Sequence, residues 1–299
     1  MLTLVLLFGL ALLTACGSPA SSSDPNSDAS AITPFDTLAP LPPERKKEST
    51  AATRVHPEAI GSYAGAFEAA EYDENADFVY ANKITIFIDS FNVTTAFGHS
   101  VVAGNLRSFS GPYKEVKEGL EITGKEPGDD RYDGVFTFVL NSEAGLLKGT
   151  WKANNNKLPV TGRTYELKYR RFAYNPNLDL PEDVLWDALY EKHAEYAGEG
   201  EFLTQDVFKY NPSKEALTRQ QVENMYKGDL EVMRNAIYAR HGYSFKNRKM
   251  RFIFDRYVEW YMPVSTDIRG DLTPLEKKNI DLMKRYEEHA DRYYDVFGR

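Results

Sequence analysis

The chain has 299 residues, a formal net charge of −8 and a single cysteine. Its content of 42% hydrophobic and 13% aromatic residues is sufficient for packed cores, which excludes wholesale disorder, and its length favours two domains. One cysteine excludes intramolecular disulfides and cysteine-based zinc sites, and the acidic balance argues against a nucleic-acid partner.

The first segment, residues 1–15, is apolar and uncharged and ends at Cys16. A membrane-spanning helix needs about 20 apolar residues, so this shorter run is typical of a signal peptide. Leu13-Thr14-Ala15-Cys16 resembles the lipobox of bacterial lipoproteins, although no basic residue precedes the apolar run. The resemblance implies cleavage before Cys16 and acylation of that residue; a buried structural cysteine is the alternative. Gly17 in the next position implies the outer membrane, with the periplasmic or surface side left open.

Residues 16–56 follow as a segment rich in Ser, Asp and Pro, with charged residues toward its end. This composition cannot build a core, so we expect the lipidated cysteine to be joined to the folded part by a flexible tether. The membrane is therefore the first expected partner, reached through the lipid anchor.

Residues 57–172 are predicted to form a β-rich domain, because short β-prone segments alternate with turn-forming residues. The predicted strands are 62–68, 83–89, 99–107, 119–123, 135–140, 147–151 and 164–169. Such a series indicates an antiparallel meander that is open or closes into a small barrel. Its order and size resemble the lipocalin or avidin architecture, but no diagnostic motif of either is present. Because a barrel can enclose a ligand, a small-molecule carrier is one alternative function.

Two features of this half suggest a metal site only at first sight. The acidic turn 126–134 lacks the spacing of an EF-hand, because Arg131 and Leu140 stand where that loop needs oxygen ligands. Hairpin turns stabilised by Asp side chains are the favoured interpretation, and another kind of cation loop is the alternative. His99 has no HxH or HExxH partner, so a structural role is expected. We predict no metal site and no cofactor.

Residues 179–297 are predicted to form a compact all-α domain, because the apolar period changes to that of helices. The predicted helices are 181–197, 218–226, 229–241, one from 247 to near 260, and one from 273 onward. Their boundaries carry local signals. Thr218 and Gln221 match a capping box, Asp229 and Asn247 are candidate N-caps, and Gly242 is placed to end a helix. Thr273, Pro274 and Glu276 combine an N-cap, an N1 proline and an N3 glutamate. The complete prediction is an α+β chain of two domains.

One motif in this half is specific. Tyr238-Ala239-Arg240-His241-Gly242 spells the sequence that names the YARHG domain, a bacterial extracellular module. The surrounding residues resemble that family as well: Met233-Arg234-Asn235, Tyr243, Phe245, Trp260-Tyr261-x-Pro263, Leu272-Thr273, Glu276 and Asn279-Ile280. The resemblance covers about residues 218–290, and Ala236 departs from it at a position where an acidic residue is expected. It implies an extracellular location and a role at the cell envelope, without a mechanism.

Arg240 and His241 have two possible roles. In the structural interpretation, His241 bonds the free carbonyls at its helix end, and Arg240 pairs with a carboxylate such as Glu276 beside aromatic rings. In the functional interpretation, the guanidinium binds the carboxylate or phosphate of a ligand. The stretch from Arg234 to Arg251 adds six basic residues without an acidic one, so it is either a solvated face or a surface for an anionic polymer. The candidate binding residues are Arg234, Arg240, His241, Arg248, Lys249, Trp260 and Tyr261.

No catalytic constellation is present: the chain lacks HExxH, a phosphate-binding loop, a Rossmann glycine pattern and a usable cysteine. We therefore expect a non-catalytic, lipid-anchored protein of the cell envelope. Its helical domain is expected to bind peptidoglycan, another envelope glycan or an envelope protein. A cell-wall hydrolase remains a third alternative, which would require paired carboxylates in a cleft.

Overall fold

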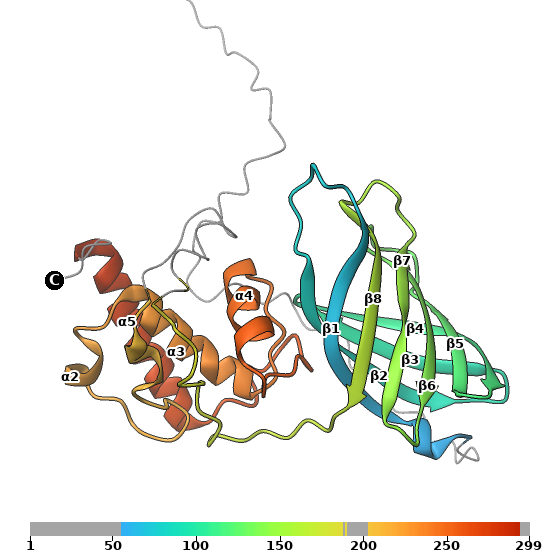
Figure 1. Cartoon of the computed structure of the whole chain (residues 1–299). Helices are drawn as coiled ribbons and strands as arrows, with labels where there is room; N and C mark the ends of the chain where they lie inside the picture. The colour runs from blue at the N-terminus through green and yellow to red at the C-terminus, as the bar shows by residue number, and fades with distance from the viewer. Residues whose placement is uncertain (1–54, 188, 190–202, 294–299) are drawn as a thin grey trace, which may run out of the picture. The chain divides into compact units, whose positions relative to one another are not determined.

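The computed structural model describes residues 55–187, 189 and 203–293 (Figure 1). Residues 1–54, with Cys16 and the predicted signal peptide and tether, lie outside the described part. The N-terminal part begins with a short 3-10 helix, η1 (Pro57–Ala59), and continues as eight strands. These are β1 (Gly61–Tyr72), β2 (Ala81–Phe91), β3 (Thr95–Val102), β4 (Asn105–Val116), β5 (Gly119–Lys125), β6 (Gly134–Asn141), β7 (Leu146–Ala153) and β8 (Val160–Tyr169).

The eight strands form a closed barrel in which each strand pairs with the next in sequence order and β8 returns to β1. All eight pairings are antiparallel. The register of β1 against β8 shifts near Ala69 and Tyr72, where a bulge bends the end of β1. The predicted antiparallel meander is thus confirmed, in its closed form.

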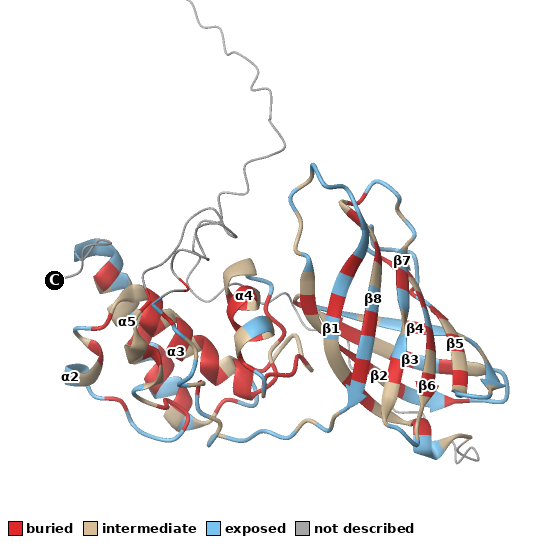
Figure 2. Ribbon diagram, viewed as in Figure 1, coloured by how far each residue is buried: buried red, intermediate tan, exposed pale blue. Residues whose placement is uncertain are grey.

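Apolar side chains fill the barrel. Buried residues alternate with exposed ones along the strands, as the stripes in Figure 2 show, so every second side chain points inward. The core cluster is rich in aromatic and β-branched residues and includes Tyr63, Phe67, Ile84, Ile86, Ile88, Phe109, Ile122, Phe136, Phe138, Leu140, Trp151, Tyr165 and Leu167. Burying each large side chain contributes about 1.5–3 kcal/mol, so this interior is the main source of the barrel's stability.

The turn between β3 and β4 was not predicted. The sequence predicts one strand over 99–107, whereas the chain reverses at Ala103 and Gly104, which have φ values of 50° and 75°. Positive φ at two successive residues matches a tight hairpin turn, but Ala is an unusual residue there. A Cβ on Gly104 would lie 2.1 Å from Cγ of Lys246, so this glycine also allows a close approach. Because Val101 and Val102 directly precede the turn, the residue pattern predicts a continuous strand there and gives no sign of the reversal.

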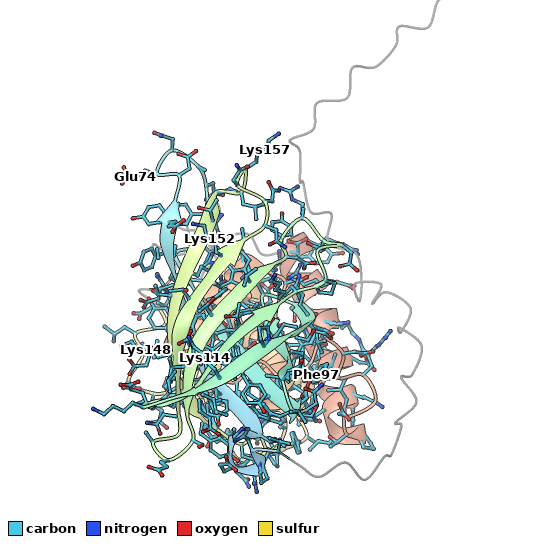
Figure 3. The ribbon with its side chains drawn as sticks, turned by 90° about the vertical axis from the view of Figure 1, so that its right-hand side faces the viewer. Glu74, Phe97, Lys114, Lys148, Lys152 and Lys157 are labelled. Carbon is cyan, nitrogen blue, oxygen red and sulfur yellow. The ribbon has the colours of Figure 1, made fainter. Side chains whose placement is uncertain are left out.

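The outer surface of the barrel carries cross-strand ion pairs. Lys114 pairs with Glu121 and Lys148 with Glu166, at 3.1 and 3.0 Å. Figure 3 shows both lysines on the outside of the barrel. Their side chains are 67% and 74% exposed, and such surface pairs are worth about 0–1 kcal/mol. This face therefore contributes solubility more than stability.

The C-terminal part is a helical region. It contains a 3-10 helix, η2 (Gln205–Phe208), and four α-helices: α2 (Arg219–Val222), α3 (Lys227–Arg240), α4 (Arg248–Tyr257) and α5 (Pro274–Tyr293). An isolated parallel bridge joins Tyr243 and Ser265 between α3 and α5 in the sequence. The helical character is confirmed, whereas a purely α domain that is separate from the barrel stays a prediction.

Two apolar clusters form the interior of the helical region. One joins α3 and α4 with the segment before η2 and is centred on Trp186, Phe254 and Tyr261. The other joins α2, α3 and α5 through Leu230, Met233, Ile237, Ile280 and Met283. Helix α3 belongs to both clusters, so its two faces are buried on opposite sides. This explains why a helix that carries the polar motif residues is almost entirely inaccessible.

The helix boundaries follow the predicted local signals in most cases. Gln221 accepts a hydrogen bond from the backbone of Thr218, and Asn247 accepts one from the backbone N–H of Met250. Asp229 departs from its prediction: α3 begins two residues earlier at Lys227, and Asp229 is buried in its first turn. There its carboxylate accepts hydrogen bonds of 2.7 Å from both the N–H and the hydroxyl of Thr204. A tertiary partner therefore overrides the capping preference.

The predicted helix 181–197 lies largely outside the described residues. Within the described part of it, Leu185 is 67% exposed, whereas the indole of Trp186 is fully buried. The apolar spacing of 181–197 places Leu185 and Leu189 on one inward stripe; Leu185 departs from this prediction, and Trp186 supplies the core contact. Leu189 is buried as expected.

Hydrogen bonds join the barrel to the helical region. The backbone N–H of Lys83 on β2 donates to Asp255 on α4 at 2.9 Å, and the ammonium of Lys83 donates to the carbonyl of Val258 at 3.0 Å. Arg170, after β8, donates to the carbonyls of Glu259 and Trp260. The described barrel and helices accordingly belong to one compact unit. Within the described residues, no helix has the length and apolarity that crossing a bilayer requires.

Candidate functional site

The YARHG motif lies at the C-terminal end of α3. Arg240 is the last helical residue, His241 is the C-cap, and Gly242 follows with φ of 72°. A Cβ at this glycine would lie 2.4 Å from Cγ2 of Val264, so both the backbone conformation and the packing require glycine. The backbone N–H of His241 donates to the carbonyls of Ile237 and Tyr238, which closes the helix. Gly242 therefore ends α3 as predicted. The side chains of Arg240 and His241 are held at this helix end.

Glu276 is the hub of the motif's hydrogen bonds. It is the N3 residue of α5, and its Oε2 accepts from the backbone N–H and hydroxyl of Thr273, the predicted N-cap. The same oxygen lies 2.9 Å from Nε2 of His241. Its Oε1 accepts from Ser213 at 2.7 Å and from Tyr174 at 3.0 Å. One carboxylate thus joins the start of α5, the end of α3 and two preceding segments.

These hydrogen bonds determine the charge state of Glu276. Burial would raise its pKa, but the bonds from His241, Thr273 and Ser213 outweigh burial and lower the pKa from 4.5 to about 2. The carboxylate is ionised at neutral pH, so Nε2 of His241 is the donor. Tyr174 stacks on the imidazole with ring centroids 4.2 Å apart. His241 therefore bonds a carboxylate, not the helix carbonyls that the sequence suggested.

Arg240 is buried without a carboxylate partner. The residue is 2% exposed, yet among the described residues no acidic oxygen lies within salt-bridge distance of its guanidinium. Its Nε donates to the carbonyl of Leu178 at 2.7 Å, and Nη1 lies 3.5 Å from the hydroxyl of Ser213. Its Cζ lies 5.7 Å from the ring centroid of Trp260. The expected direct pair with Glu276 is replaced by a contact through Ser213.

The environment of Arg240 penalises its charge. Burial lowers the pKa of Arg240 to about 10, although Asp179 and Glu276 oppose that shift. The guanidinium keeps its charge at neutral pH. Of its five N–H donors, the hydrogen bonds to Leu178 and Ser213 engage only Nε and Nη1, and Nη2 has no partner among the described residues. A buried cation with unused donors is an uncommon arrangement in a purely structural role.

A cavity of about 220 Å³ adjoins this guanidinium. Arg240 and Trp260 line it together with the segment that follows β8. The full lining consists of Arg170, Arg171, Phe172, Ala173, Asn175, Leu178, Ala239, Arg240, Trp260 and Met262. The cavity is therefore basic and aromatic, with three arginines and no acidic residue.

The polar network does not have the order of a catalytic triad. In such a triad the histidine lies between the nucleophile and the acid. Here the carboxylate of Glu276 lies between Ser213 and His241, because the Ser213 hydroxyl donates to Glu276 itself. The Ser213 hydroxyl is thus held by an acceptor that is ionised and weakly basic. The arrangement can orient groups and stabilise charge, and it supplies no activated nucleophile.

The basic stretch from Arg234 to Arg251 is largely ion-paired within the chain. Arg234 forms a bidentate pair with Glu287 at 2.6 and 2.9 Å. Arg248 pairs with Asp77, and Lys249 pairs with Glu231. The structure thus brings these predicted residues to different acidic partners and not to one surface site. Tyr261 is 1% exposed and its hydroxyl donates to the carbonyl of Tyr243, so it belongs to the core.

His99 and the acidic turn 126–134, the candidate sites in the barrel, are engaged by partners within the chain. His99 bonds Asp89 at 2.9 Å and stacks on Phe87. In the acidic turn, Asp133 accepts from backbone N–H groups and pairs with Arg107 at 3.1 Å. Within the described residues, no group of three or more His, Cys, Asp or Glu side chains is placed to hold a metal ion.

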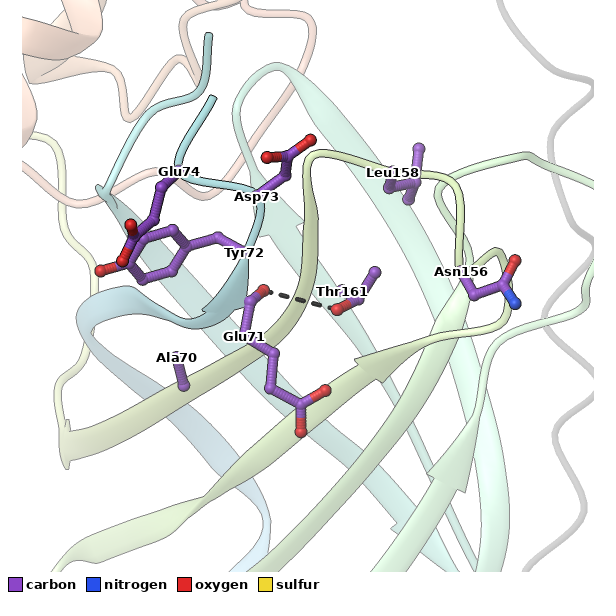
Figure 4. Close-up of a pocket in the computed structure, with 8 residues that line it drawn as sticks. All are labelled: Ala70, Glu71, Tyr72, Asp73, Glu74, Asn156, Leu158 and Thr161. Atoms are coloured by element: carbon purple, nitrogen blue, oxygen red, sulfur yellow. Dashed lines mark hydrogen bonds between the residues drawn. The ribbon is translucent and has the colours of Figure 1, made fainter. Parts of the chain in front are cut away.

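A second cavity lies at one end of the barrel, where the end of β1 faces the loop before β8 (Figure 4). It measures about 560 Å³ and is lined by Ala70, Glu71, Tyr72, Asp73, Glu74, Asn156, Leu158 and Thr161. Figure 4 shows that the side chains of Glu71, Asp73 and Glu74 point in different directions. Because its carboxylates do not converge on one point, this opening is a weaker candidate than the cavity at Arg240.

Several residues of the candidate site carry no local signal in the sequence. Ser213 and Tyr174 precede the region that the motif marks, and nothing near them in the sequence shows that they reach Glu276. Arg171, which is exposed at the cavity, stands in the segment that leaves the barrel. The adjacent pair of arginines at 170 and 171 was the available signal, because it follows the last strand directly.

Comparison with known proteins gives one finding. Residues 206–288 match the sequence model of the YARHG domain, so the match begins before the predicted start near 218 and includes Ser213. Comparison with curated proteins and with solved structures finds no match for this chain. The helical region that holds Arg240, His241 and Glu276 is therefore a YARHG domain.

Proposed function

We propose that this chain is a non-catalytic, lipid-anchored protein of the bacterial cell envelope that binds an envelope polymer or protein through its YARHG domain. The domain at residues 206–288 supports a place at the envelope. The apolar segment 1–15 followed by Cys16 supports an acyl anchor, and Gly17 favours the outer membrane.

The observation that carries the binding role is the buried, unpaired guanidinium of Arg240 at the cavity. A charge in such a position costs stability unless a partner compensates it. The chain pairs the other arginine of α3, the half-buried Arg234, with Glu287. That it leaves Arg240 without a carboxylate next to an open cavity supports a partner from outside the chain.

The geometry favours this cavity over the basic stretch as the binding surface. Arg248 and Lys249 already have carboxylate partners, so their positive charge is balanced locally. Of the predicted binding residues, Arg240 and Trp260 line the cavity. His241 does not line it and contributes through its hydrogen bond with Glu276.

The barrel is better explained as a scaffold than as a carrier. Its interior is filled by buried side chains, and neither of the two cavities described above lies among them. No observation favours hydrolysis either, because the motif's carboxylate is engaged by donors on both oxygens. We therefore propose no second function.

The anchor is tested by metabolic labelling with a palmitate analogue followed by membrane fractionation. The wild-type chain should carry the label and sediment with the envelope, and Cys16→Ser should do neither. Label that persists in Cys16→Ser would contradict the anchor.

Polymer binding is tested by co-sedimentation of the chain, purified in detergent, with isolated peptidoglycan at low and high salt. We expect retention at low salt and partial loss at high salt, because charge contributes to binding. The double variant Arg248→Glu with Lys249→Glu should be retained like the wild type. Loss of its retention would show that the basic stretch contributes to binding. Recovery of the wild type wholly in the supernatant would contradict polymer binding.

A further inference from the structure

We propose that the cavity beside Arg240 binds the free carboxylate of a peptide chain end whose last residue has a small aliphatic side chain. This inference rests on the proposed binding role of the YARHG domain and names the chemical group that the domain recognises.

The donors favour a planar anion. The guanidinium of Arg240 presents N–H groups in one plane, and a carboxylate matches them with two parallel hydrogen bonds. Nε is held by the carbonyl of Leu178 at 2.7 Å, which fixes the plane of the guanidinium and leaves Nη2 and the second N–H of Nη1 for a ligand. The side-chain amide nitrogen of Asn175, which also lines the cavity, has no partner among the described residues and adds a neutral donor.

The charge around the cavity matches one negative group. Arg170 is committed to the carbonyls of Glu259 and Trp260, and no acidic side chain lines the space. Arg171 is exposed, and among the described residues it forms no ion pair. Arg240 is the buried cation of this lining, and one planar carboxylate compensates its single charge.

The walls and the size narrow the ligand further. Phe172, Ala173, Ala239, Trp260 and Met262 form apolar surface next to the guanidinium. A ligand must therefore place a small apolar group close to its anion. At about 220 Å³, the space is below the roughly 300–1,000 Å³ of a typical small-molecule site, so it admits a chain end and not a whole polymer strand.

The experiment is isothermal titration calorimetry on the whole chain, purified in detergent, with three probes. These are N-acetyl-alanyl-alanine with its free carboxylate, the same dipeptide as its C-terminal amide, and inorganic phosphate. The acid should bind at least about tenfold more tightly than the amide, because the amide loses the charge-assisted bonds to Arg240. Phosphate should bind more weakly than the acid.

Three variants locate the site. Arg240→Lys keeps the charge and removes the planar fork, and it should weaken binding of the acid by about tenfold. Arg171→Ala changes an exposed residue, so it leaves the fold intact and should weaken binding by about two- to fivefold. Arg285→Ala, which removes an exposed cation from α5, is the matched control and should bind like the wild type. Circular dichroism verifies that each variant is folded.

Equal affinity for acid and amide, tighter binding of phosphate, or no heat with any probe would overturn the inference. Binding that is unchanged in a folded Arg171→Ala and Arg240→Lys would overturn it as well. The result is distinguishable from failure of the proposed function. Binding of the dipeptide without retention on peptidoglycan would reject the polymer and keep the cavity. Retention on peptidoglycan that is unchanged in Arg240→Lys would keep polymer binding and reject the cavity as its site.

Discussion

The barrel and the helical region bury different kinds of side chain at their centres. The barrel encloses aromatic and aliphatic groups such as Phe136 and Ile84, which make contacts in all directions and need no defined partner. The YARHG domain encloses Glu276 and Arg240 between its apolar clusters, where each polar atom depends on a specific donor or acceptor. The barrel therefore gains its stability from the dense packing of apolar side chains, whereas the helical region gains a defined geometry from hydrogen bonds.

Removal of the hub should have the largest effect. Glu276→Ala leaves Ser213, Tyr174 and His241 without their buried acceptor, and we expect a loss of about 3–5 kcal/mol in the free energy of unfolding. Urea denaturation monitored by circular dichroism measures it. The control is Glu288→Ala on the exposed face of α5, which should change stability by less than about 0.5 kcal/mol. A loss below about 1 kcal/mol for Glu276→Ala would show that the network is not a stabilising hub.

An added methyl group in the barrel interior tests its packing, again through the free energy of unfolding. Gly98→Ala places a Cβ 2.3 Å from the carbonyl oxygen of Phe87 and 2.5 Å from Cζ of Phe109. Because a packed interior cannot move aside, we expect a loss of about 1–3 kcal/mol, measured by urea denaturation. Gly270→Ala is the matched control, since nothing lies within 4 Å of an added Cβ there. Equal stability of the two variants would mean that the barrel interior is more pliable than its packing indicates.

The two regions should also respond to pH with opposite signs. In the barrel, burial raises the pKa of Glu126 from 4.5 to about 6, against the hydrogen bonds from Trp151 and Gly134. A raised folded-state pKa means that stability decreases as pH rises from about 4.5 to about 6. The lowered pKa of Glu276 acts in the opposite direction, because its contribution is complete above about 4.5 and is lost as pH falls toward 2.

Glu126→Gln separates the two contributions. The amide oxygen can still accept from Gly134 and Trp151, which lie 2.7 and 3.1 Å from the carboxylate, but the group no longer titrates. Relative to the wild type, the variant should gain about 1–2 kcal/mol between pH 4 and pH 7, measured by urea denaturation at both values. A stability difference that is constant across this range would contradict the assignment to Glu126.

The fold could be predicted from the sequence where one period or one local signal determines the structure. Alternation in segments such as 135–140 predicts strands, and the capping residues at 218, 247 and 273 mark helix starts correctly. The hairpin at Ala103 and Gly104 could not be predicted, because valines on one side and a leucine on the other continue the strand pattern. Closure of β8 on β1 is likewise a property of the whole sheet, which no local segment encodes.

The candidate site could be predicted only in part, for a related reason. The motif identifies Arg240 and His241 as special residues, but their partners come from distant segments. Ser213 and Tyr174 reach Glu276 across 63 and 102 positions of the chain. A sequence with 44 acidic residues gives no means of choosing which carboxylate faces which cation. The exchange of roles, in which His241 bonds Glu276 and Arg240 stays unpaired, is a property of the tertiary structure.

The closed order of the strands restricts how the barrel can take part in assembly. Because β8 bonds to β1, the barrel offers no row of unpaired backbone N–H and C=O groups along its circumference. A partner cannot extend the sheet by adding a strand of its own, which is a common mode of peptide capture. Any protein that docks on the barrel must recognise side chains, such as the lysines on its outer face, so recognition there depends on residue identity and not on backbone.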